Sequence, residues 1–88
     1  GGAVSLRNLA RLTLDPSGHP VHWKLEAQNG ETLWIPVDAA GAEALFDAFA
    51  ALPGLNMARM LQALQSEGKT SQVIWEHRSV QASRARLQ

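Results

Sequence analysis

The amino-acid sequence predicts a small α+β domain with two layers: a four-stranded antiparallel sheet, and two helices packed on one of its faces. The chain has 88 residues and 45% of them are hydrophobic, a size and composition sufficient for one core and too small for two domains. Between residues 4 and 37, apolar and polar side chains alternate in three separate segments, as they do in half-buried strands. Residues 38–66 repeat apolar side chains at helical spacing, and residues 70–77 are again strand-like. The predicted order along the chain is therefore β-β-β-α-α-β.

Residues 4–14 and 20–27 are the first two predicted strands. Asp15-Pro16-Ser17-Gly18 lies between them, and Pro at its second position and Gly at its fourth fit a type I turn. A four-residue loop over these positions places apolar side chains of the two strands on one face and an exposed ion pair on the other. The opposed pairs are then Leu12 with Val21, Ala10 with Trp23, and Arg7 with Glu26.

Residues 31–37 form the third predicted strand, which follows Gln28-Asn29-Gly30. A two-residue Asn29-Gly30 loop would put Lys24 on the same face as Ile35 and mix polar with apolar side chains. A three-residue loop, with Gly30 left-handed in a bulge after a type I turn, brings the apolar side chains together. We therefore predict the three-residue loop. The opposed pairs are then Trp23 with Ile35, Leu25 with Leu33, and Val21 with Val37.

Two short helices are predicted over residues 38–68. Asp38 is placed to cap the first helix, Leu52-Pro53-Gly54 ends it, and Asn56 is placed to cap the second. Gly68 fits the C-terminal cap of the second helix. The predicted apolar stripes consist of Ala42, Leu45, Phe46, Phe49 and Leu52 in the first helix and Met57, Met60, Leu61 and Leu64 in the second.

Residues 70–77 are rich in β-branched and aromatic side chains and form the last predicted strand. The helix pair returns the chain to the end of the sheet where the third strand stops, so this strand runs antiparallel to both the first and the third. It can therefore pair with either edge of the sheet. A meander of strands that leads into a helix also resembles pleckstrin-homology-like modules, although those have more strands and a terminal helix. A fragment of such a roll is the alternative fold.

The two ends of the chain differ in composition from its middle. The sequence opens with Gly1-Gly2 and no initiating Met, and we interpret residues 1–3 as a cleavage scar or a linker from a longer protein. Residues 4–77 form the single predicted domain. Residues 78–88 contain three arginines and no acidic residue, which predicts a basic tail that is either helical or disordered.

Charge and composition exclude several classes of protein. Eight Lys and Arg balance eight Asp and Glu, and a neutral chain lacks the basic surface on which nucleic-acid binding depends. The absence of cysteine excludes disulfides, thiolate nucleophiles and cysteine-ligated zinc. No apolar run approaches the roughly 18–20 residues that span a bilayer. We expect a cytoplasmic module, including the cytoplasmic domain of a membrane protein, that meets a membrane only through flanking segments or the basic tail.

The sequence contains no pattern typical of a catalytic or metal site. The serines are scattered, and none lies in a Gly-x-Ser-x-Gly elbow. His19, His22 and His77 suggest metal ligands, but side chains three residues apart in a strand point to opposite faces. We therefore predict no metal, no cofactor and no enzymatic activity.

The sheet face opposite the predicted helices is the most informative surface. An antiparallel sheet can leave one face exposed to water, yet a Trp in the middle of such a face is unusual. Leu9, Lys24 and Trp34 fall in one row across the strands. Three explanations stay open: residues 78–88 or the first few residues cover Trp34, a second copy packs on it, or another protein binds it. On the predicted register the face carries Leu9, Arg11, Thr13, His22, Lys24, Glu26, Thr32, Trp34 and Pro36.

We predict from this face that the chain is a non-catalytic protein-interaction or assembly module. The partner is another protein or a second copy of this chain, which would form a homodimer. The alternative is a small-ligand or lipid-binding domain on the cytoplasmic side of a membrane protein, which requires a pocket between sheet and helices. The predicted contact residues are Leu9, Arg11, His22, Lys24 and Trp34.

Overall fold

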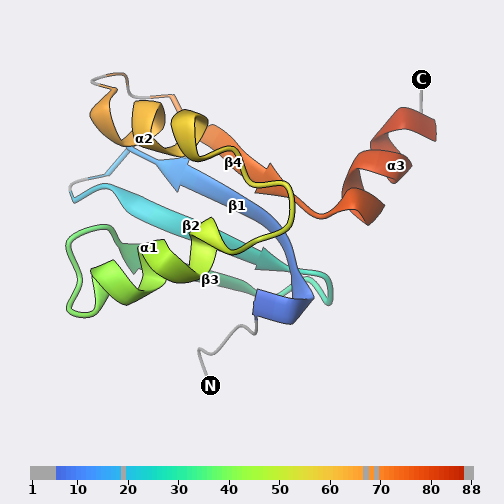
Figure 1. Ribbon diagram of the computed structural model, residues 1–88, viewed down its shortest axis with the longest axis horizontal. Helices are drawn as coiled ribbons and strands as arrows, with labels where there is room; N and C mark the ends of the chain where they lie inside the picture. The colour runs from blue at the N-terminus through green and yellow to red at the C-terminus, as the bar shows by residue number, and fades with distance from the viewer. Residues whose placement is uncertain (1–5, 19, 67, 69, 87–88) are drawn as a thin grey trace.

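Residues 6–18, 20–66, 68 and 70–86 are described in the computed structural model, with the backbone alone for residues 83–86. These residues form a four-stranded antiparallel sheet and three α-helices (Figure 1). In chain order the elements are a 3₁₀ turn at Leu6–Asn8, β1 at Leu9–Asp15, β2 at His22–Ala27, β3 at Thr32–Pro36, α1 at Ala42–Ala50, α2 at Met57–Gln65, β4 at Gln72–Glu76 and α3 at Arg78–Arg86.

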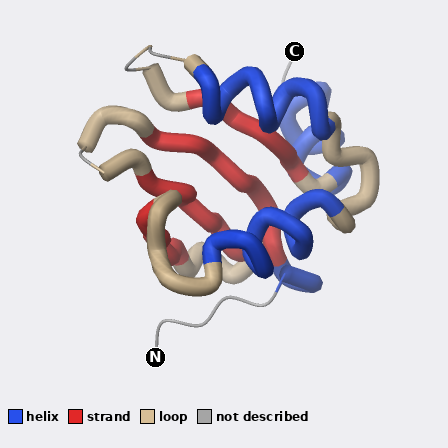
Figure 2. The backbone as a smooth tube through the Cα atoms, turned by 60° about the vertical axis from the view of Figure 1, so that its left-hand side comes forward, coloured by secondary structure: helices blue, strands red, loops and turns tan. Residues whose placement is uncertain are grey.

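The sheet and the pair α1–α2 form two layers, as the sequence predicts. Figure 2 shows both helices on the same face of the strands. The strand order is β3-β2-β1-β4, so the last strand takes the edge beside β1 rather than the edge beside β3. All four described strands belong to one sheet, which confirms the two-layer α+β fold over the roll-like alternative. Helix α3 extends beyond the end of β4, away from the other two helices (Figure 1).

The β2–β3 hairpin has the predicted register and loop. Trp23 pairs with Ile35, as the alternation of apolar side chains requires. Gly30 has a φ of 93°, the left-handed conformation predicted for it, and its N–H donates to the Ala27 carbonyl at 3.0 Å. The requirement that both strands bury the same face was enough to select the three-residue loop.

The β1–β2 connection differs from the prediction. Leu12 pairs with Leu25 rather than with Val21, so the partner position on β2 is displaced by four residues. The connection is longer because the Ser17 N–H donates to the Asp15 carboxylate at 2.9 Å, a local turn that replaces a tight hairpin. A displacement by an even number of residues keeps each side chain of β2 on its predicted face.

A β-bulge at Ala10 changes the start of β1. The pairing register shifts between Leu9 and Arg11, and Leu9 turns into the core, where it is 0% exposed. The sequence alternation placed Leu9 on the exposed face with Arg11, and that prediction is wrong. Arg11, rather than the predicted Arg7, lies opposite Glu26.

Helix α1 begins later than the sequence predicts. Gly41, not Asp38, occupies the N-cap position, with a φ of 83° and no side-chain hydrogen bond. A left-handed residue cannot lie inside a right-handed helix, so the helix begins only at Ala42. The preceding residues form turns instead, in which the Ala39 N–H donates to the Pro36 carbonyl at 3.0 Å.

Helix α2 begins as predicted and ends differently. The Asn56 side chain accepts a hydrogen bond from the Arg59 N–H at 3.0 Å, which makes it the N-cap. The helix ends at an extended Ser66, so Gly68 is not its C-terminal cap. Among the described residues, none of the helices is long and apolar enough to cross a bilayer.

The core fills the space between the sheet and the pair α1–α2. Phe49 of α1 and Met60 of α2 are completely buried, and the Trp23 ring meets Phe49 edge-on at a centroid distance of 5.2 Å. Met57 and Leu61, predicted for the apolar stripe of α2, stay exposed because the buried side of the helix is centred on Met60. The other buried hydrophobic residues are Leu9, Leu12, Leu14, Leu25, Ala27, Leu52, Ala63, Ile74 and Trp75.

Candidate functional site

The candidate site is the face of the sheet opposite α1 and α2, called the back face below. It carries the side chains that alternate along each strand with those of the core. Helices α1 and α2 cover the other face (Figure 2), and α3 lies beyond the end of β4 (Figure 1). By the register of the strands, the back face consists of Arg11, Thr13, Asp15, His22, Lys24, Glu26, Thr32, Trp34, Pro36, Val73 and Glu76.

One row of side chains crosses all four strands of the back face. This central row consists of Trp34, Lys24, Thr13 and Val73, each paired with the next across neighbouring strands. Trp34 and Val73 stand at its two ends, 48% and 41% exposed. The Lys24 amine lies 5.2 Å from the centroid of the Trp34 ring, a cation–π contact that restrains the indole without covering it. The row therefore presents apolar surface at both edges of the sheet.

Lys24 of the central row and three charged side chains beside the row pair with one another. The Arg11 guanidinium contacts the Glu76 carboxylate at 3.0 Å and the Glu26 carboxylate at 3.5 Å. The Lys24 amine lies 3.8 Å from Glu26 as well. The Glu76 side chain is only 7% exposed, and a buried carboxylate is tolerated when a cation holds it in this way. These two cations and two anions cancel, so this part of the back face has no net charge.

His22 and Asp15 lie at the end of the back face near the β1–β2 connection. His22 Nδ1 lies 2.8 Å from the Pro20 carbonyl oxygen, and because a carbonyl only accepts, Nδ1 carries the proton. Hydrogen bonds from the Ser17 hydroxyl and N–H hold the pKa of Asp15 below its ordinary value of 3.8. This end of the face is therefore polar and organised by local turns.

The structure brings together four of the five predicted contact residues. Arg11, His22, Lys24 and Trp34 share the back face and belong to adjoining rows. Leu9 does not, because the bulge at Ala10 directs it into the core. Thr13, instead of Leu9, lies in the row with Lys24 and Trp34.

Sequence reasoning missed three members of the back face: Asp15, which it assigned to the turn, and two residues of β4, Val73 and Glu76. The sequence left the partner strand of β4 open, so the neighbours of Val73 and Glu76 could not be assigned. A bulge between the pairs of β4 with Leu12 and Thr13 also breaks the alternation of this strand. The available signal was Arg11, a cation on the sheet face that needs an acidic neighbour on the strand next to β1.

Helix α3 does not cover Trp34. The Gln81 side chain of α3 donates to the Glu76 carbonyl at 3.0 Å, which places the helix beside β4, whereas Trp34 lies on β3 at the other edge of the sheet. The first five residues, the second cover considered from the sequence, lie outside the described part of the chain.

The histidines are dispersed. His19 lies outside the described residues, and His77 Nδ1 accepts a hydrogen bond from the Ser79 N–H at 3.0 Å at the start of α3. Within the described part of the chain, no three His, Asp or Glu side chains lie close enough to hold a metal ion.

Comparisons with known proteins add no relative. The chain matches no protein-family model, no curated protein and no solved structure. The function of the chain is therefore inferred from the geometry of the back face and of the surfaces beside it.

Proposed function

We propose that the chain is a non-catalytic protein-interaction module whose contact surface is the back face around Trp34. The observation that carries this proposal is the central row, in which a half-exposed Trp is restrained by Lys24 and faces outward. Trp and Arg are enriched among the residues that dominate binding energy at protein interfaces. Arg11 supplies the second of these residue types, and its carboxylate partners hold it in place.

The central row is suited to a second copy of this chain as the partner. Its apolar members stand at opposite edges of the sheet, with Thr13 and Lys24 between them. A twofold axis parallel to the strands exchanges the two edges, so Trp34 of one copy would lie over Val73 of the other. The neighbouring charges cancel, so two such faces do not repel each other. Stacked sheets lie about 10 Å apart, a separation that these side chains can fill.

Sedimentation velocity over a concentration series tests this proposal. The unmodified chain is expected to dimerise, and Trp34→Ala is expected to raise the dissociation constant about tenfold or more, because a Trp that anchors an interface typically contributes about 2 kcal/mol or more. Leu61→Ala is the matched control: Leu61 is similarly exposed, at 42%, but lies on α2 in the other layer. It should leave the dissociation constant unchanged.

Two results would contradict the proposal in different ways. If the chain is monomeric at every concentration, its partner is not a second copy. The back-face proposal then requires that the unmodified chain and Trp34→Ala differ in their binding of other proteins. If Trp34→Ala changes neither assembly nor the proteins that bind, the back face is not the contact surface.

The alternative of a small-ligand or lipid-binding domain finds less support inside the fold. Large side chains such as Phe49, Met60 and Trp23 fill the space between the sheet and the helix pair. The hollow at the end of that layer, beside Leu14 and Leu64, measures about 110 Å³. Sites for small molecules typically measure about 300–1,000 Å³. A small molecule bound between the sheet and the helix pair would therefore have to displace core residues.

A further inference from the structure

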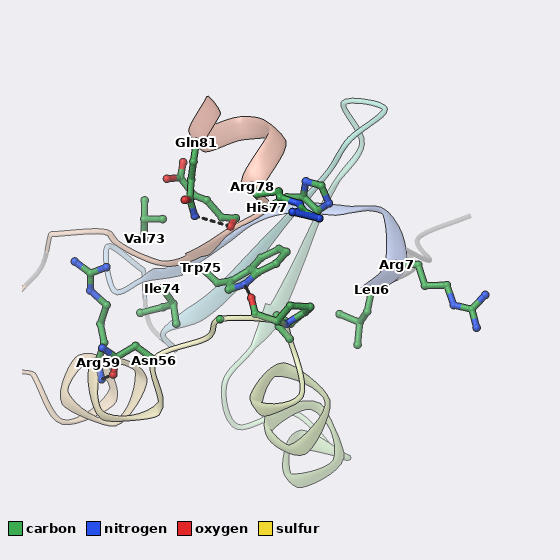
Figure 3. A pocket seen from close by; sticks show the side chains of 14 residues that line it. Leu6, Arg7, Asn56, Arg59, Val73, Ile74, Trp75, His77, Arg78 and Gln81 are labelled. Atoms are coloured by element: carbon green, nitrogen blue, oxygen red, sulfur yellow. Dashed lines mark hydrogen bonds between the residues drawn. The ribbon is translucent and has the colours of Figure 1, made fainter. Parts of the chain in front are cut away.

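A groove of about 820 Å³ follows the outer edge of β4 (Figure 3). One wall is β4 with the beginning of α3, and the other is the loop Leu52–Asn56 with the beginning of α2. Leu6 and Arg7 lie at one end. Its size falls within the range of sites that hold a ligand, roughly 300–1,000 Å³. Val73 and Glu76 belong both to this groove and to the back face, whereas Trp34 and Lys24 do not line the groove.

The floor of the groove is apolar and fixed. Trp75 and Leu52 are 8% exposed and Ile74 is 3% exposed, so only small parts of these side chains reach the groove. The Trp75 indole N–H donates to the Pro53 carbonyl at 2.7 Å, which ties the loop to β4 across the floor. Because this bond holds the two walls together, the shape of the groove is set before a ligand binds.

The backbone of β4 faces the groove. In the described sheet, β4 has a neighbour, β1, on one side alone. The His77 N–H donates to the Ala10 carbonyl of β1, and backbone groups of consecutive strand residues point in opposite directions. The Glu76 backbone groups therefore point outward, and the Glu76 carbonyl accepts its hydrogen bond from the Gln81 amide at 3.0 Å. That amide occupies the position that the N–H of an added strand would take.

The groove is bordered by cations. Arg59 at one end, Arg7 at the other and Arg78 at the beginning of α3 line it (Figure 3). Arg59 and Arg78 form no ion pair with the part of the chain that the structure describes. Glu76 is the acidic lining residue, and its carboxylate is engaged by Arg11. A chain with no net charge thus concentrates positive charge at one strand edge.

We propose that this groove binds an extended acidic peptide, which adds to β4 as a further strand. Strand edges bind peptides through backbone hydrogen bonds, and flanking side chains select the sequence. Here the flanking side chains are arginines, which select Asp and Glu, while Val73, which is 41% exposed, offers apolar surface. The five residues of β4 span about 17 Å, so they match a peptide of similar length.

Selection from random heptapeptides displayed on phage, with the full chain immobilised at low ionic strength, provides the probes. We expect enriched peptides to contain Asp or Glu together with β-branched residues. Their affinity is then measured by fluorescence polarisation for the unmodified chain and for Arg59→Gln, which should weaken binding about tenfold or more through loss of a charged contact. Ala44→Glu changes the net charge equally but lies at an exposed position of α1, which does not line the groove, and should change affinity less than about twofold because exposed charges at a distance are screened.

Further measurements separate a strand-like complex from simple ion binding. Amide shifts in ¹⁵N spectra should concentrate at residues 73–77 and 52–56 when a selected peptide is added. Methylation of a peptide backbone nitrogen at the centre should weaken binding, because an added strand needs that donor. Trp34→Ala should bind the peptides normally, so failure of the back-face proposal and failure of this one are distinguishable.

Several results would overturn the proposal. One is the absence of any enriched peptide, and another is enrichment without acidic residues. Equal weakening by Arg59→Gln and Ala44→Glu would show attraction to net charge rather than to the groove. A single-stranded oligonucleotide that displaces the selected peptides and binds more tightly than they do would assign the groove to nucleic acid instead.

Discussion

Glu76 has a part both in the pairing of two strands and in the surface of the back face. Its side chain is 7% exposed, and the Arg11 guanidinium contacts it at 3.0 Å across the β1–β4 pairing. Water reaches little of this carboxylate, so contacts within the protein must stabilise its charge. The pair therefore joins the last strand to the first as well as shaping the back face.

Glu76→Gln removes this charge with little change in shape. We expect the free energy of unfolding to fall by about 1–3 kcal/mol, because Arg11 loses its nearest carboxylate and an amide replaces it in the same site. Urea unfolding measures the change. Glu31→Gln, at an exposed loop position, should change stability by less than about 0.5 kcal/mol. Equal effects of the two substitutions would show that the Arg11 contact adds no stability.

Asp15 provides a prediction for pH at the same scale. Ser17 lowers its pKa in the folded chain, so the contribution of Asp15 to stability is present above its ordinary pKa of 3.8. That contribution is lost as the pH falls through the lowered value. Ser17→Ala removes the hydroxyl donor and keeps the N–H donor, so the pKa should rise part of the way towards 3.8. Carboxyl NMR titration measures it, with Ser79→Ala as the unaffected control; an unchanged Asp15 pKa in Ser17→Ala would contradict this cause.

At the scale of elements, the helices depend on their ends and on packing. Helices α1 and α2 each contain nine residues, a length at which an isolated helix is unstable in water. Phe49 and Met60, which are fully buried, anchor one helix each to the sheet. The ends then decide where each helix starts, through Gly41 for α1 and Asn56 for α2.

Gly41→Ala tests the beginning of α1. At a φ of 83° a side chain is strained even though its Cβ would meet open space, so we expect a loss of about 1 kcal/mol or more. Gly68→Ala is the control, because Gly68 lacks a left-handed φ and its added Cβ would lie in ordinary contact with Ser66 at 3.4 Å. Thermal unfolding followed by circular dichroism compares them. If both variants unfold at the same temperature, the left-handed turn does not set the start of α1.

At the scale of the whole molecule, the alternation of side chains between the two faces of each strand was the most reliable guide from sequence to fold. This alternation is called parity below. Burial of one face requires Trp23 to oppose Ile35, which predicted the second hairpin and its loop. Parity cannot distinguish displacements of two or four residues, so Leu12 was predicted opposite Val21 although it pairs with Leu25. Away from the bulge at Ala10, the faces were predicted correctly even where the partners were not.

The candidate site was predictable to the extent that parity holds. Arg11, His22, Lys24 and Trp34 lie on the regular parts of their strands, and their common face follows from alternation. Leu9 precedes a bulge, and an inserted residue leaves no sign in a hydrophobicity pattern. The groove at β4 joins segments that only the tertiary fold brings together, which is why Arg59 and Arg78 were not recognised as neighbours.

The three tryptophans occupy three different environments. Trp23 is 3% exposed in the core, Trp75 is 8% exposed with its N–H bonded to a carbonyl, and Trp34 is 48% exposed to water. Indole emission shifts to longer wavelength in water and is quenched by solutes that reach the ring. The red edge of the intrinsic fluorescence and its quenching by iodide therefore come mainly from Trp34. The protein carries its own optical reporter for occupation of the back face, with no label required.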